Sequence, residues 1–133
     1  MKKRRVISPQ VGEPPQDTWS NCLVIGDQVF IAGMTARGAT FDGAVVGDGA
    51  YEQAVAIFTK IKHLVEEAGA VMDDIIKVTI FVTDISRREE VWKARREFFT
   101  GDFPCSTLVE VSALARPGLA VEIEAHGFIG ASK

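Results

Sequence analysis

The stretch from Phe103 to Ile129 constrains the fold most, because it alternates apolar and polar residues in two runs separated by Arg116-Pro-Gly. A period of two residues is that of a β-strand with two different faces. In the second run, one face carries Leu119, Val121, Ile123, Ala125 and Ile129, and the other carries Glu122, Glu124, His126 and Phe128. Ionised glutamates are rare on buried strand faces, so this face is either wet or functional. If the two strands pair across the Pro-Gly break, Glu110 joins the same polar face.

The preceding residues predict two helices and several further strands. Two short apolar runs, 22–25 and 28–32, flank Gly26-Asp27 and predict a hairpin. A one-sided apolar stripe predicts a helix over 51–68, and alternation predicts a strand over 74–83. Ser86 and Glu89 have the spacing of a capping box, which predicts a second helix to about residue 100. The glycine-rich segment 33–49 is expected to be a loop with a short strand near 44–46.

This order of elements predicts an α+β fold, with a mixed sheet and both helices on one face. Two helices cover only one side of such a sheet. The side that carries Glu122 and Glu124 therefore needs another cover, and self-association is the simplest one.

Length and composition predict a single domain over residues 1–133, in which residues 1–18 form an extended, proline-containing arm with a solvated basic run at 2–5. No apolar run approaches the ~20 residues of a membrane span. The charged N-terminus is not followed by an apolar signal segment, so the expected location is cytoplasmic.

The cysteine, histidine and charge counts exclude several classes of site. Cys22 and Cys105 are too few for a disulfide scaffold, and no metal-ligand spacing occurs, so neither metal nor cofactor is expected. Four of the fifteen basic residues occupy the first five positions, which leaves eleven against eighteen acidic residues elsewhere. Nucleic-acid binders usually have the opposite charge on their working face, so no nucleic-acid partner is expected.

Two motifs in the C-terminal stretch resemble the signature of the Rid/YjgF family, formerly the L-PSP endoribonucleases. The first is Pro104-x-Ser106-x-x-Val109-Glu110-Val111, and the second is Val121-Glu122-Ile123-Glu124-Ala125. The similarity extends upstream through residues 25–33 and the helix after Ala50, and covers the chain from about Trp19. This resemblance implies a chorismate mutase-like, YjgF-type fold with a six-stranded sheet. It also implies a homotrimeric barrel with small-molecule clefts between subunits.

The resemblance implies imine or enamine hydrolysis, which yields a keto acid and ammonia. Glu122 matches the family glutamate that holds the attacking water, a role suited to a carboxylate with a raised pKa. Gly33 matches the glycine whose backbone lies against the substrate. Both positions of this chain retain the family pattern.

Other positions depart from the deaminase pattern. Ser106 stands where deaminases have an arginine for the substrate carboxylate, and losing such a charged contact costs roughly 2–5 kcal/mol. Trp19 stands in place of a tyrosine, Ala32 in place of a serine, and Trp92 in place of a polar residue from the neighbouring subunit. With Cys105 beside Ser106, these residues predict a broader, more apolar cleft. Alternatively, Trp19 and Trp92 only pack an interface.

The sequence leaves open which residue replaces the arginine, whether Cys105 is a nucleophile, and which of three functions the protein has. Arg37 or Arg116 could supply the missing guanidinium, and Cys105 could act as a nucleophile if His126 were its base. The first function is hydrolysis of an imine bulkier or more apolar than 2-aminoacrylate. The second is a non-catalytic trimeric metabolite binder or regulator. The third, an endoribonuclease, is disfavoured by the acidic balance.

Overall fold

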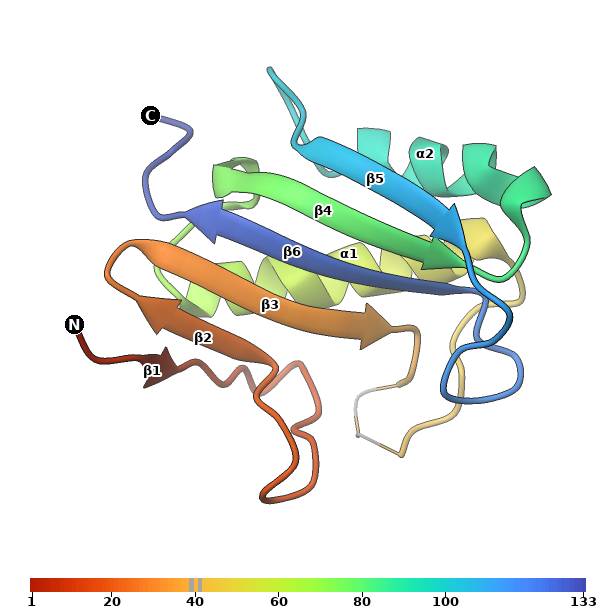
Figure 1. Cartoon of the computed structure of the whole chain (residues 1–133), viewed down its shortest axis with the longest axis horizontal. Helices are drawn as coiled ribbons and strands as arrows, with labels where there is room; N and C mark the ends of the chain where they lie inside the picture. Colours follow the sequence, from red (N-terminus) through yellow and green to blue (C-terminus); the bar gives the residue numbers. More distant parts are fainter. Residues whose placement is uncertain (39, 41) are drawn as a thin grey trace.

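The structure is a computed structural model that describes residues 1–38, 40 and 42–133. Six strands form one sheet in the order β1-β2-β3-β6-β4-β5. Both α-helices lie on one face of it, and the other face is uncovered (Figure 1). The predicted α+β architecture is therefore confirmed. The strands are β1 (Arg4–Arg5), β2 (Cys22–Ile25), β3 (Gln28–Thr35), β4 (Ile75–Val82), β5 (Cys105–Glu110) and β6 (Val121–Phe128), and the helices are α1 (Ala50–Glu67) and α2 (Arg88–Arg96).

The core lies between α1 and the helix-facing side of the sheet. Ile57, Phe58 and Ile61 on α1 are fully buried, as are Ile80 on β4 and Ile123 on β6. Burying one such side chain contributes about 1.5–3 kcal/mol. The apolar stripe and the strand alternation therefore placed these elements correctly.

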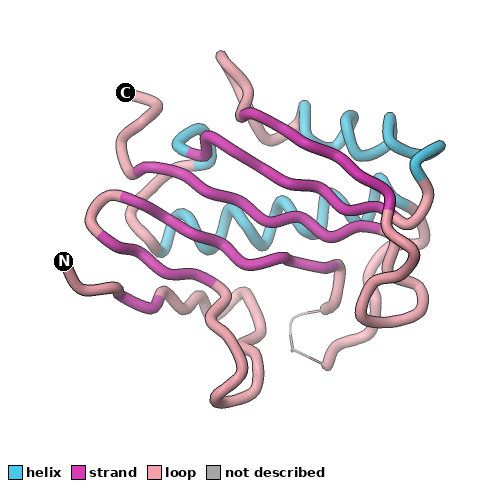
Figure 2. Tube along the Cα trace, viewed as in Figure 1, coloured by secondary structure: helices cyan, strands magenta, loops and turns pink. Residues whose placement is uncertain are grey.

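The two C-terminal strands do not pair with each other, so the condition under which Glu110 would join the polar face of Glu122 is not met. β5 pairs in parallel with β4, and β6 lies between β3 and β4, antiparallel to both. The connection over residues 111–120 is too long for a tight hairpin turn, and it leads the chain past the end of β4 (Figure 2). Glu110 consequently sits at the sheet edge, where its carboxylate accepts a hydrogen bond from the Ile85 N–H (2.9 Å).

The second helix begins differently from the predicted capping box. A short 3₁₀ turn, η2 (Ile85–Arg87), precedes it, and Asp84 caps this turn by accepting from the Ser86 N–H (3.0 Å). The Ser86 hydroxyl donates to the same carboxylate (2.6 Å), and Ser86 lies inside η2 rather than at the N-cap of α2, which is Arg87. The predicted capping box fails because the 3₁₀ turn moves the start of the helix beyond Ser86. The regular helix then ends at Arg96, before the expected residue 100.

Two other local expectations also change. The short strand near 44–46 is only a single bridge between Arg37 and Val45, and residues 39 and 41 of the glycine-rich segment lie outside the described residues. The basic N-terminal run is not simply a solvated tail, because Arg4 and Arg5 form β1 against β2. The arm is held further by Val6, which is buried.

Candidate functional site

A pocket of about 150 Å³ lies beside the C-terminal end of β3, where β2 has not yet begun and the N-terminal arm passes alongside. It brings together three of the predicted site residues: Trp19, Gly33 and Glu122. Two cationic residues line the same pocket, Arg37 and Lys60. Trp19 is 47% exposed, so a broad aromatic surface is open at this site.

Glu122 is positioned by the two strands that flank it. It pairs with Thr35 on β3 and with Phe81 on β4, and its side chain is half-buried. Burial raises the pKa of the Glu122 carboxyl, and the nearby Glu124 raises it further, whereas Arg37 opposes both effects. A carboxylate of this kind is suited to accept a proton from water.

Gly33 is required by the close approach of Glu122. The register of β3 against β6 shifts between Ile31 and Met34, in the segment that contains Gly33. A Cβ atom at position 33 would lie 2.7 Å from Oε2 and 2.9 Å from Cδ of Glu122. Glycine therefore leaves the space in which the carboxylate rests.

Lys60 is a site residue that the sequence reasoning missed. Its Nζ donates to the carbonyl oxygen of Thr35 (2.9 Å), the residue opposite Glu122 in the sheet. Burial, with a smaller contribution from Arg37, lowers the pKa of Lys60 to about 8. The only sign of this role in the sequence is that Lys60 lies directly beside the apolar stripe of α1, next to Ile61.

The two arginines considered as substitutes are in different places. Arg37 lines the pocket and influences both ionisable groups in it. Arg116 instead forms an ion pair with Asp42, with 3.0 Å between Nη2 and Oδ1.

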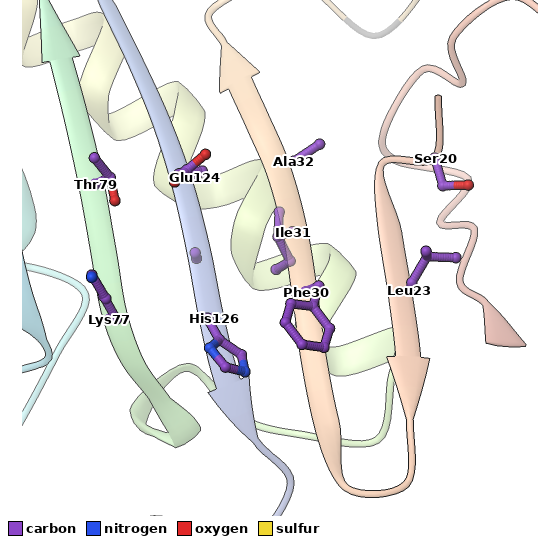
Figure 3. Close-up of a pocket in the computed structure, with 10 residues that line it drawn as sticks. Ser20, Leu23, Phe30, Ile31, Ala32, Lys77, Thr79, Glu124 and His126 are labelled. Atoms are coloured by element: carbon purple, nitrogen blue, oxygen red, sulfur yellow. The ribbon is translucent and has the colours of Figure 1, made fainter. Parts of the chain in front are cut away.

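Ala32 lines a different cavity, of about 420 Å³, on the uncovered face of the sheet. Figure 3 shows Phe30 and Ala32 on β3, His126 and Glu124 on β6, and Lys77 and Thr79 on β4. Phe30 and His126 stack with their ring centroids 4.3 Å apart, and His126 Nε2 lies 3.1 Å from Gln28 Oε1.

Cys105 and His126 are not brought into contact. Both pair with Lys77, one from β5 and the other from β6, so the strand β4 separates them. Two strand spacings amount to about 9.5 Å, which is beyond direct proton transfer. The cysteine-nucleophile hypothesis therefore has no geometric support in the described structure.

Ser106 and Trp92 lie on the helix side of the sheet, away from Glu122. The Ser106 hydroxyl accepts a hydrogen bond from Arg95 Nη1 of α2 (2.8 Å), and Leu108, two residues on, packs against the core. Trp92 has the Arg88 guanidinium 5.7 Å from its ring centre. Strand alternation places Glu122 on the opposite face, so one chain does not assemble all the predicted residues into one site.

Among the described residues, no group of three or more His, Cys, Asp or Glu side chains could hold a metal ion. In the same part of the chain, neither helix has the length and apolar character needed to cross a membrane.

Comparison with known proteins gives consistent matches. A family model described as Endoribonuclease L-PSP matches residues 12–129. A 2-iminobutanoate/2-iminopropanoate deaminase from Dermatophagoides farinae is 30% identical over 124 residues, covering 93% of this chain and 95% of the relative. A solved protein of unknown function from Pseudomonas aeruginosa is 37% identical, with a TM-score of 0.86 and coverage of 97% and 94%. A Rid family protein from Yersinia pestis is 26% identical, with a TM-score of 0.88 and coverage of 96% and 100%.

Proposed function

The chain belongs to the endoribonuclease L-PSP family, which includes the Rid/YjgF proteins, and on this premise we propose that it hydrolyses an imine or enamine of a 2-oxo acid. The single observation that carries the proposal is the Glu122 carboxylate, which has a raised pKa and lies over the Gly33 backbone inside a pocket. The deaminase from Dermatophagoides farinae supports the same reaction class.

Each atom of this reaction is accounted for by water and one carboxylate. Glu122 accepts a proton from water as its oxygen attacks the C=N carbon. Glu122 returns that proton to the nitrogen, which gives a tetrahedral intermediate with hydroxyl and amino groups on the same carbon. The hydroxyl proton then passes to the nitrogen through Glu122 as the C–N bond breaks, so ammonia leaves, the C=O bond forms and Glu122 is again a carboxylate. Such general-base assistance contributes about 10²–10⁴-fold in rate.

We propose a substrate bulkier or more apolar than 2-aminoacrylate, because the exposed ring of Trp19 forms one wall of the pocket. The assay compares kcat/KM for freshly generated imines of increasing side-chain size. A steady fall in kcat/KM with size would contradict this substrate preference.

We also propose a homotrimer in which Ser106 and Trp92 of one copy approach the Glu122 pocket of the next copy. The proposal is supported by the family and by the uncovered sheet face, where Phe30 is 42% exposed. Light scattering that reports a monomer at micromolar concentration would contradict it.

The experiment that tests the reaction is ammonia release by wild type and by Glu122→Gln, an isosteric change that removes the base. The expected result is a loss of about 10²-fold or more in kcat/KM. Glu124→Gln retains the base but removes a charge that raises the pKa of Glu122, so the acid limb of its pH–rate profile should move to lower pH. If wild type does not exceed buffer with any imine, the site is a metabolite-binding site without catalysis.

A further inference from the structure

We propose that Lys60 and Arg37 together bind the substrate carboxylate, within the same chain that supplies Glu122. This inference rests on the proposed function, and it assigns recognition of the negative charge to two residues of the Glu122 pocket. These two residues would do the work of the arginine that deaminases of the family carry at the position of Ser106.

Lys60 is a partly buried cation whose described hydrogen-bond acceptor is neutral. Its amine is half-buried, and the described hydrogen bond goes to a neutral carbonyl oxygen, that of Thr35. The ion pairs found among the described residues involve other cations: Arg5, Arg87 and Arg116. An ammonium group has three N–H donors, so two remain for a ligand. Burial without a counter-charge is costly, and a bound carboxylate would offset that cost.

Arg37 links Lys60 to the catalytic carboxylate. Its positive charge lowers the pKa of Lys60 and also that of Glu122, so it lies within electrostatic range of both groups. Two neighbouring cations repel each other, and a carboxylate that binds both removes the repulsion. Arginine adds a planar fork that matches the two carboxylate oxygens.

The position of the pair relative to Glu122 suits a 2-imino acid. Glu122 and Lys60 both meet β3 at Thr35, one by strand pairing and the other at the carbonyl oxygen. A carboxylate held by the two cations therefore leaves the adjacent C=N carbon near the Glu122 side of the pocket. Trp19, on the same pocket wall, is left for the apolar side chain.

The charge on Lys60 adds a pH dependence. With a pKa of about 8, the free amine loses its charge within an accessible range, and a bound carboxylate favours the charged form. Affinity for a carboxylate should therefore fall as the pH rises through about 8 and beyond.

The test measures binding of 2-oxobutanoate and of its neutral amide by calorimetry, for wild type, Lys60→Met, Arg37→Met and the control Lys62→Met. Lys62 is an exposed lysine on the same helix. Both pocket variants should bind 2-oxobutanoate about tenfold or more weakly, with little change for the amide, because a charge-assisted hydrogen bond is lost. Lys62→Met should bind like wild type. Lys60→Gln, which retains a donor without the charge, covers the case in which Lys60→Met does not fold.

A variant of Arg95, the arginine beside Ser106, tests the alternative that the carboxylate binds near Ser106 instead. Arg95→Met removes the guanidinium that contacts Ser106 on the opposite face of the sheet. If Arg95→Met loses 2-oxobutanoate binding while Lys60→Met and Arg37→Met retain it, the inference is overturned.

Failure of the proposed reaction gives a different pattern. Charge-dependent binding that needs Lys60, without ammonia release by wild type, would refute the hydrolase but support this site. Ammonia release with unchanged KM in Lys60→Met and Arg37→Met would support the hydrolase and refute this site.

Discussion

Replacing Gly33 with alanine is expected to abolish most of the proposed imine hydrolysis while leaving the fold nearly as stable. The new Cβ would lie 2.7 Å from Oε2 of Glu122, whereas ordinary contact begins near 3.4 Å, so the carboxylate must move by about 0.7 Å. The displaced atom ends a flexible side chain, and an off-rotamer adjustment costs about 0.5–1.5 kcal/mol. A misplacement approaching 1 Å at a reacting group can cost about 10²-fold in rate.

The matched control is Gly127→Ala on the same strand as Glu122. There the new Cβ would lie 2.6 Å from the Asp74 carbonyl oxygen and 3.0 Å from the Ile75 Cα, which are backbone atoms and cannot rotate away. This variant should lose about 1–3 kcal/mol in free energy of unfolding, with activity per folded molecule largely retained.

Urea unfolding and ammonia release on both variants complete the assay. The reasoning is refuted if Gly33→Ala has wild-type kcat/KM, because Glu122 would then not need its described position. It is also refuted if Gly33→Ala unfolds as easily as Gly127→Ala.

Two further predictions concern stability. Burial raises the pKa of Asp74, but hydrogen bonds from Ser132, Val71 and Gly130 together outweigh it and hold that pKa below its usual value. The stabilisation is complete above the unfolded-state pKa and is lost as the pH falls through the folded-state pKa. Urea midpoints of Asp74→Asn should therefore be lower than wild type at pH 6, with the difference narrowing toward pH 3; a constant difference would contradict this. Asp84→Ala should lower the urea midpoint because the cap on the Ser86 N–H is lost, and an equal lowering in Glu89→Ala would contradict the Asp84 cap.

Much of the fold could be predicted because its determinants are local. The apolar stripe of α1 and the alternation of β6 are patterns within contiguous residues, and each pattern predicts which face of its element is buried. The parallel pairing of β5 with β4 is a non-local choice, and alternation alone does not state which strand is the neighbour. Ser86 is not the N-cap of α2 for a related reason: Asp84, two residues earlier, caps the 3₁₀ turn η2, and this turn moves the start of α2 beyond Ser86.

The candidate site was predictable only where strand position alone decides the geometry. Gly33 and Glu122 lie on neighbouring strands, so their positions along the sheet bring them together. Lys60 reaches the same place from a helix, over a distance that depends on how α1 packs on β3. Single-sequence periodicity describes which face a residue occupies, but it does not give the reach of a long side chain across the edge of a sheet.

The separation of Ser106 from Glu122 changes how the serine at position 106 should be interpreted. On β5, Ser106 faces α2 and already accepts a hydrogen bond from Arg95, while Glu122 opens on the other face. An arginine at position 106 would therefore not reach the Glu122 pocket of its own chain. The proposed anchor, Lys60, lies in the Glu122 pocket of the same chain, so a serine at position 106 does not by itself imply loss of substrate binding.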